Sequence, residues 1–206
     1  MTTLARGTVY GTLMNFRGEL EALGSKMNEA PYLAPPKAPV LYVKPANTWS
    51  ENGAVIRVPA GAQVTVGATV AMVMRSATEV AGFVLMNDLS LPQESFYRPP
   101  VKLNCLDGFL GIGDRIRARN EAGDPAVFKL EVRINGALVQ TVRFSQLVRP
   151  ADKLLADVSA FMTLGAGDML MLGCDAERPR AGAGDRIDIS MPALGTLTNT
   201  LAAEAA

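Results

Sequence analysis

The stretch from residue 81 to residue 108, AGFVLMNDLSLPQESFYRPPVKLNCLDG, carries the strongest signal about the fold. An apolar segment with the character of a buried strand runs into the pair Asn87-Asp88. A loop follows that holds two carboxylates, two cations and two aromatic residues. Convergent polar groups at the end of an apolar scaffold are typical of binding and catalytic sites. The stretch therefore predicts a strand and, just beyond it, a candidate functional site.

The overall composition predicts one globular domain. The chain has 206 residues, of which 49% are hydrophobic and 19% charged, so it can bury a substantial core. We expect this domain to cover residues 1–200 and residues 201–206 to form a frayed tail. The 20 basic and 20 acidic residues give a net charge of zero, which argues against nucleic acid or an anionic membrane as a partner. An apolar signal-peptide core and a run of membrane-spanning length are both missing, so we expect a cytoplasmic protein.

Two residue types limit the chemistry of the site. The chain contains no histidine, which excludes histidine-based triads, histidine general bases and histidine metal ligands. Its only cysteines are Cys105 and Cys174, and their spacing does not suit a metal site. We expect two partly buried free thiols, with a disulfide or a nucleophile as the less favoured alternatives.

Local patterns predict an α+β fold that is mainly β. Residues 8–14 and 40–43 read as strands, and residues 54–86 as several short buried strands separated at Gly61, Gly67 and Gly82. Residues 128–144 predict a hairpin around Asn135-Gly136, a pair that suits a type I′ turn. A helix is expected from Asn15 to about residue 26. A second helix is expected after Pro150, with one apolar face made of Leu154, Leu155, Val158, Phe161 and Met162.

The order of short motifs resembles the fumarylacetoacetate hydrolase family over nearly the whole chain. These motifs are Asn15-Phe16-Arg17, Lys44-Pro45, Gly82-Phe83 with Asn87-Asp88, Asn135-Gly136, residues 164–168 with Gly173, Gly184-Asp185 and Leu194-Gly195. Further segments are similar to the N-terminal half of the bifunctional isomerase/decarboxylases of 4-hydroxyphenylacetate (homoprotocatechuate) degradation, a subfamily with two tandem copies of the fold. They are SFYRP at residues 95–99, DGF at 107–109, APPK at 34–37 and GATVA at 67–71.

The resemblance implies a fold, a reaction and partners. The fold would be the mixed β-roll or sandwich of the family with two or three short helices. The activity would be isomerisation or decarboxylation of a 2-oxo or 2-hydroxy-diene dicarboxylate, a small-molecule substrate. The alternative is a metal-free, inactive subunit that packs against an active paralogue. We expect a homodimer or a complex with a paralogous chain.

The resemblance also implies a metal site, which this chain has largely lost. Active family members hold Mg²⁺ or Mn²⁺ with a Glu-x-Glu pair and the Asp of the Asn-Asp motif, since such cations need oxygen ligands. Here the Glu-x-Glu positions are Gly67 and Thr69, so Asp88 is the only surviving ligand. We therefore expect no tightly bound cofactor. Asp88 has an alternative role as a structural turn acid.

The remaining candidate residues are cations, amides and one acid. Glu94 is the candidate general base, and Arg98 and Lys102 are candidate catalytic cations. Candidate substrate-binding residues are Asn15, Lys44, Asn87 and Asn104. The alternative for Glu94 is a plain salt bridge to Arg98, and the cations can equally be solvated surface residues. Glu19 lies near the position where the family often has a histidine.

Overall fold

The structure is a computed structural model, and it describes residues 7–93 and 101–204. The described strands are β1 (Val9–Leu13), β2 (Val40–Lys44), β3 (Trp49–Glu51), β4 (Val55–Val58), β5 (Val64–Met74), β6 (Val80–Ser90), β7 (Leu110–Ile112), β8 (Lys129–Ile134), β9 (Ala137–Arg143), β10 (Met169–Met171), β11 (Arg180–Ala181), β12 (Arg186–Met191) and β13 (Gly195–Ala203). The α-helices are α1 (Arg17–Leu23), α2 (Val101–Asn104), α3 (Arg119–Ala122) and α4 (Ala151–Ser159). Single 3-10 turns lie at η1 (Gly24–Asn28), η2 (Ala46–Thr48), η3 (Pro125–Val127) and η4 (Phe144–Gln146).

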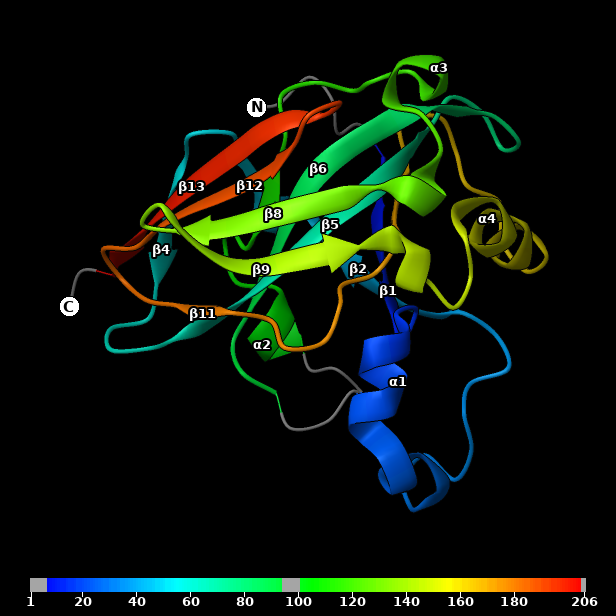
Figure 1. The fold of residues 1–206 in the computed structure, drawn as a ribbon, viewed down its shortest axis with the longest axis horizontal. Coiled ribbons are helices and arrows are strands. Elements are labelled where there is room, and N and C mark those ends of the chain that lie inside the picture. The colour runs from blue at the N-terminus through cyan, green and yellow to red at the C-terminus, as the bar shows by residue number, and fades with distance from the viewer. Residues whose placement is uncertain (1–6, 94–100, 205–206) are drawn as a thin grey trace.

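The strands form two sheets that pack face to face. The larger sheet has the order β2-β1-β10-β5-β6-β7-β3, and β11 adds to it by pairing with β5. The smaller sheet has the order β4-β13-β12-β8-β9 and lies across β5 and β6 (Figure 1). This arrangement confirms the predicted α+β fold dominated by β-structure, with four short α-helices in the described residues rather than two or three.

The strands β5 and β6 are longer than the sequence predicts. Each has 11 residues, and they pair antiparallel over nearly their whole length, so the expectation of several short strands in residues 54–86 is wrong. Gly67 and Gly82 lie inside these strands because another backbone comes too close for a side chain: a Cβ on Gly67 would lie 2.5 Å from the carbonyl oxygen of Asp88. Of the three expected breaks, only Gly61 lies in a turn, with a φ of 72°.

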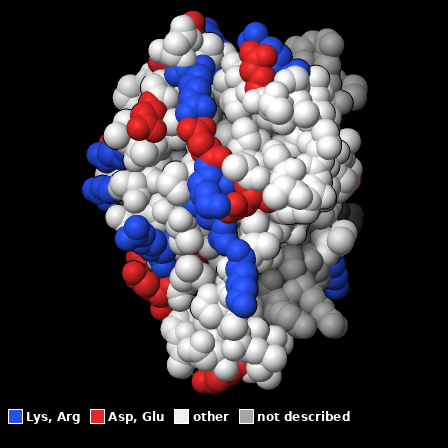
Figure 2. All heavy atoms as spheres, turned by 90° about the vertical axis from the view of Figure 1, so that its right-hand side faces the viewer, with Lys and Arg blue, Asp and Glu red and all other residues white. Residues whose placement is uncertain are grey.

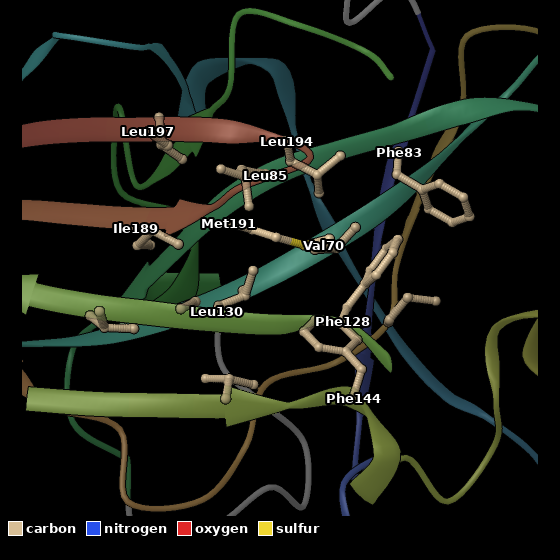
Figure 3. Packing of buried hydrophobic residues seen from close by; sticks show 14 of the residues in the cluster. Val70, Phe83, Leu85, Phe128, Leu130, Phe144, Ile189, Met191, Leu194 and Leu197 are labelled. Carbon is tan, nitrogen blue, oxygen red and sulfur yellow. The ribbon is translucent and has the colours of Figure 1, made fainter. Parts of the chain in front are cut away.

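The core fills the space between the two sheets. Inward-facing residues of β5 and β6, among them Val70 and Leu85, meet residues of the smaller sheet such as Leu130 and Ile189 (Figure 3). An edge-to-face series of rings extends this core. Phe83 and Phe128 have ring centroids 5.4 Å apart, Phe128 and Phe144 6.0 Å, and Phe144 and Phe16 5.5 Å.

The locally encoded elements agree with the sequence, with two corrections. The hairpin β8–β9 turns at Asn135 and Gly136, whose φ angles of 52° and 83° fit a type I′ turn. The helix α4 buries Leu154 and Val158 as expected. Phe161, however, follows the end of α4 and is 58% exposed, so its assignment to the buried face is wrong.

The first helix and the C-terminal segment also differ from expectation. The first helix, α1, begins at Arg17 and ends at Leu23, and its N-cap is Phe16 rather than Asn15. Residues 201–203 continue strand β13, and Leu201 is buried in the core, so this part of the expected tail is not frayed. In the described residues, no helix is long and apolar enough to cross a membrane.

Charged side chains on the α4 side of the molecule occur in pairs. Figure 2 shows positive and negative groups alternating along this face. Arg119 bonds Asp152 at 2.6 Å, and Asp157 lies 2.5 Å from Lys153 and 3.2 Å from Arg149. Pairing of this kind leaves little local charge surplus around α4.

The aromatic series gives the first testable prediction. We expect Phe128→Ala to lower the free energy of unfolding by about 3–5 kcal/mol, because it leaves a cavity at the centre of the series. Phe161→Ala is the matched control and should change stability by less than about 0.5 kcal/mol, since that ring is exposed. Denaturant unfolding measures both. Equal losses in the two variants would contradict this view of the core.

Candidate functional site

The candidate site lies on the face of β5 and β6 that points away from the smaller sheet. Gly67 of β5 is paired directly with Asp88 of β6. Side chains two residues apart on a strand share a face, so Thr65, Gly67 and Thr69 line this surface with Asp88 and Ser90. The elements around it are β2, α1 and the segment between β10 and β11.

Asp88 is held by a cation and a hydroxyl group. The Lys44 Nζ lies 2.7 Å from Asp88 Oδ1, and the Tyr42 hydroxyl donates a hydrogen bond to Asp88 Oδ2. Lys44 also donates to the carbonyl oxygens of Leu89 at 2.8 Å, Asn104 at 2.6 Å and Phe109 at 3.1 Å. The Lys44 side chain is 0% exposed, and these partners account for its donors. In this structure Lys44 therefore joins several backbone segments to Asp88, and its predicted role in substrate binding stays a prediction.

Burial also fixes the state of Tyr42. Burial, followed by the negative charge of Asp88, raises the pKa of Tyr42 well above 10. The phenol therefore keeps its proton and stays a hydrogen-bond donor to Asp88. Its ring lies over Gly11 of the neighbouring strand β1, where a Cβ would overlap it.

A second buried ion pair lies next to the first. Glu19 of α1 is 1% exposed, and its Oε1 accepts a hydrogen bond from Arg178. Its Oε2 is also buried and has no hydrogen-bond partner among the described residues. Burial raises the pKa of Glu19, and the charge of Arg178 offsets only part of this rise. Glu19 is thus a carboxyl group that can carry a proton at higher pH than an exposed glutamate.

The positions of the missing metal ligands are filled by the chain itself. A Cβ on Gly67 would lie 2.9 Å from Cys174 Sγ, so the buried thiol occupies the space next to this position. The Thr69 hydroxyl donates to the carbonyl oxygen of Gly173 at 2.5 Å. Asp88 is already neutralised by Lys44. This donor set does not fit a divalent cation, which requires several oxygen ligands with excess negative charge. The part of the chain that the structure describes contains no group of three acidic or thiol side chains placed to hold a metal ion.

Several residues predicted from the sequence do not converge. Asn15 donates to the carbonyl oxygens of Leu172 and Arg149 and accepts from the Arg149 N–H, so its side chain joins three segments of backbone. Asn87 points to the opposite face of β6 from Asp88 and donates to Asn199 at 3.2 Å. Both side chains are bonded within the protein in this structure, and their predicted roles in binding a keto oxygen stay predictions.

The loop residues follow a different pattern from the one expected. Lys102 is exposed on the helix α2, and its predicted role as a catalytic cation stays a prediction. The Asn104 side chain accepts a hydrogen bond from Gln93 at 2.5 Å. The backbone carbonyl oxygen of Asn104 accepts a hydrogen bond from Lys44. Glu94 and Arg98 lie outside the described residues, and their predicted roles stay predictions.

The site also contains residues that the sequence analysis did not select. Tyr42 lies two positions before Lys44 on one strand, so the strand period alone could have placed it beside the candidate lysine. Glu19 could have been selected from its position near the family histidine. Arg178 gives no local signal, because it meets Glu19 across 159 residues of chain.

Comparison with protein-family models gives one match, which covers residues 8–202 and describes the fumarylacetoacetate (FAA) hydrolase C-terminal domain. The chain belongs to the fumarylacetoacetate hydrolase family. The matching model describes the C-terminal domain of the family, so the chain resembles that domain. Its assignment to the N-terminal copy of the bifunctional subfamily draws no support from this match and stays a prediction.

Individual relatives agree with the assignment to the fumarylacetoacetate hydrolase family. The chain is 36% identical to the 4-hydroxyphenylacetate degradation bifunctional isomerase/decarboxylase of Salmonella dublin over 97% of its own length and 48% of that protein. It therefore spans about half the length of this relative. Among solved structures, 2-hydroxyhepta-2,4-diene-1,7-dioate isomerase from Mycobacterium marinum is 26% identical with a TM-score of 0.79, covering 98% of this chain and 77% of that one.

A third comparison bears on metal binding in the family. Fumarylpyruvate hydrolase from Pseudomonas aeruginosa, solved in complex with Mn²⁺ and pyruvate, has a TM-score of 0.81 over 96% of this chain and 90% of that chain. At 17% identity this likeness shows the shared fold alone.

The donor set predicts how the chain responds to metal. We expect low-millimolar Mg²⁺ or Mn²⁺ to leave the melting temperature unchanged, because a ligand raises it only by binding the native state. Differential scanning fluorimetry with EDTA as the reference tests this. A clear rise with metal that disappears in Asp88→Ala would show that a divalent cation does bind there.

The environment of the thiols predicts unequal reactivity. Burial raises the pKa of Cys174 to about 12, so only about one molecule in 10⁴ carries the thiolate at pH 8. We expect maleimide to label only the half-buried Cys105 in the native protein and both thiols in guanidinium, as measured by intact mass. Cys105→Ser should then abolish native labelling. Rapid labelling of Cys174 in that variant would show that its packing against Gly67 is loose.

Proposed function

We propose that this chain isomerises 2-hydroxy-diene dicarboxylates, or decarboxylates the related 2-oxo acids, in the catabolism of aromatic compounds. The similarity to a bifunctional isomerase/decarboxylase of 4-hydroxyphenylacetate degradation and to a 2-hydroxyhepta-2,4-diene-1,7-dioate isomerase supports this substrate class. The single observation that carries the proposal is the buried carboxyl group of Glu19, which lies beside Arg178 with one oxygen atom unpartnered in the described residues.

Isomerisation of such a diene is a proton transfer. The 2-hydroxyl group loses its proton to a base, the electron pair moves through the conjugated double bonds, and C5 takes up a proton to give the 2-oxo-3-ene. A base for this step works best when its pKa is raised toward the working pH. Glu19 meets this condition through burial. Glu94 remains the other candidate base.

Negative charge that develops on the 2-oxygen needs a fixed positive group or a hydrogen-bond donor. Arg178 is the cation next to Glu19, and it is only 14% exposed, so water screens it weakly. Lys44 is less suited to this role because its donors are taken by Asp88 and three carbonyl oxygens. The proposal therefore places the reaction at Glu19 and Arg178, and uses Lys44 and Asp88 as scaffold.

A second candidate function has its own supporting observation. The Glu-x-Glu positions hold Gly67 and Thr69, and the chain spans about half of its bifunctional relative. A chain of this kind can serve as the inactive partner in a complex with a metal-binding paralogue. The alternative assembly is a homodimer of this chain. Light scattering of the purified chain, alone and coexpressed with such a paralogue, tests the association directly.

The proposed reaction predicts a metal-independent activity that depends on Glu19. We expect conversion of 2-hydroxyhepta-2,4-diene-1,7-dioate, followed by ultraviolet absorbance, to continue in EDTA. Glu19→Gln should lower kcat by about 10²–10⁴-fold because it removes the proton acceptor. In the wild type, kcat should rise with pH through a pKa above the usual 4.5 of glutamate, since the base must lose its proton first. This rise should be absent in Glu19→Gln.

The matched control is Glu21→Gln, an exposed residue two positions further along the same helix, which should keep wild-type activity. Loss of activity in EDTA would mean that a metal takes part. Activity that appears only when a metal-binding paralogue is added would favour the partner-subunit function instead.

A further inference from the structure

A cavity of about 220 Å³ lies beside the buried cluster, on the same face of β5 and β6. Its lining residues are Thr65, Ser90, Pro92, Gln93, Glu177, Arg178 and Arg180. They include two guanidinium groups, two hydroxyl groups and one amide, all of which can donate hydrogen bonds. None of the candidate residues that fall within residues 7–93 and 101–204 lies in this lining.

The sheet register explains why these side chains meet. Thr65 of β5 pairs with Arg180 of β11 on one side and with Ser90 of β6 on the other. Directly opposed residues project to the same face, so these three form one row across the sheet. The next row along the same face is Gly67 with Asp88. Rows two residues apart are separated by about 7 Å.

Arg178 connects the two rows. It lies two residues before Arg180, so in the antiparallel count it falls opposite Gly67, a position that has no side chain of its own. Its guanidinium donates to Glu19 and, through Nε, to the carbonyl oxygen of Asp175 at 3.3 Å. A guanidinium has five donors in a rigid fork, so it can bind more than one acceptor.

We propose that this cavity is a carboxylate subsite, in which Arg178 and Arg180 bind one carboxylate end of an acid ligand. Thr65, Ser90 and Gln93 supply neutral donors around it. The inference rests on the proposed function, because it names the group that anchors the dicarboxylate beside Glu19. A carboxylate bound to Arg178 would bring the adjacent carbon atoms of the ligand next to the buried base.

The charge balance selects a carboxylate over a doubly charged phosphate. The lining carries two arginines and one glutamate, Glu177, and Arg178 is paired with Glu19 beneath it. Arg178 is thus balanced by Glu19 and Arg180 by Glu177, so this set of groups has no net charge, which suits a singly charged, planar group held by directed donors better than a dianion. Guanidinium forks match carboxylates in a bidentate manner.

The test is calorimetric titration with heptanedioate, an unreactive dicarboxylate of the proposed substrate's length, and with 1,7-heptanediol as its uncharged analogue. We expect the wild type to bind heptanedioate and to show no heat with the diol. Arg178→Gln should weaken heptanedioate binding at least about tenfold, because it removes charge-assisted hydrogen bonds. Arg180→Gln should weaken it less, since that side chain is exposed to water. The matched control is Arg143→Gln, an exposed arginine on β9, which should bind as the wild type does.

Removing Arg178 alone leaves Glu19 buried without its partner, which can prevent folding. A second variant therefore distinguishes a loss of binding from a loss of folding. The double variant Glu19→Gln/Arg178→Gln keeps the side-chain volumes and removes both charges, and it should also lose at least about tenfold in affinity. Wild-type affinity in either Arg178 variant would overturn the subsite, as would the absence of heptanedioate binding to the wild type.

The outcomes also separate the subsite from the proposed function. Heptanedioate binding that depends on Arg178, without any turnover of the diene, supports the subsite and contradicts the isomerase. Turnover by the wild type, with a lowered kcat but an unchanged KM in Arg178→Gln, supports the isomerase and overturns the subsite.

Discussion

The buried ion pair between Lys44 and Asp88 is the contact on which the architecture of this site depends. One ammonium group joins β2 to β6 through Asp88 and Leu89, to the end of α2 through Asn104, and to the start of β7 through Phe109. Breaking a buried pair by removing one partner typically costs about 3–5 kcal/mol, since the other charge is left without compensation. Asp88 is therefore needed for stability, which gives a physical reason for its presence where its two family co-ligands are replaced.

The loss of those co-ligands changes the packing as well as the charge. With glycine at position 67, the backbones of β5 and β6 come close, and Cys174 packs where a carboxylate would project. Thr69 turns its hydroxyl group to a backbone carbonyl. The surface is thus filled beside Gly67, and a cavity lies beside Arg178 and Arg180.

The sequence predicts what local signals encode. The Asn135-Gly136 hairpin, the α4 helix and the strand β2 follow from turn chemistry and periodicity, and the motif order gives the family. The lengths of β5 and β6 were misjudged because a glycine in a strand can mark a turn or a close backbone approach, and only the tertiary structure distinguishes the two. The opposite orientation of Asn87 and Asp88 follows from the strand period, because β6 continues through both residues.

The candidate site itself was predicted only in part, because its charges pair across long stretches of chain. Lys44 and Asp88 were found through motifs, whereas the partner of Glu19 lies 159 residues away. The two ion pairs are each neutral, so the buried part of the site has no surplus charge to attract a dianion. Affinity for such a ligand must then come from directed donors at the cavity rather than from a long-range field. A neutral protein can bind an anionic metabolite in this way, provided that a guanidinium is already held in place before the ligand arrives.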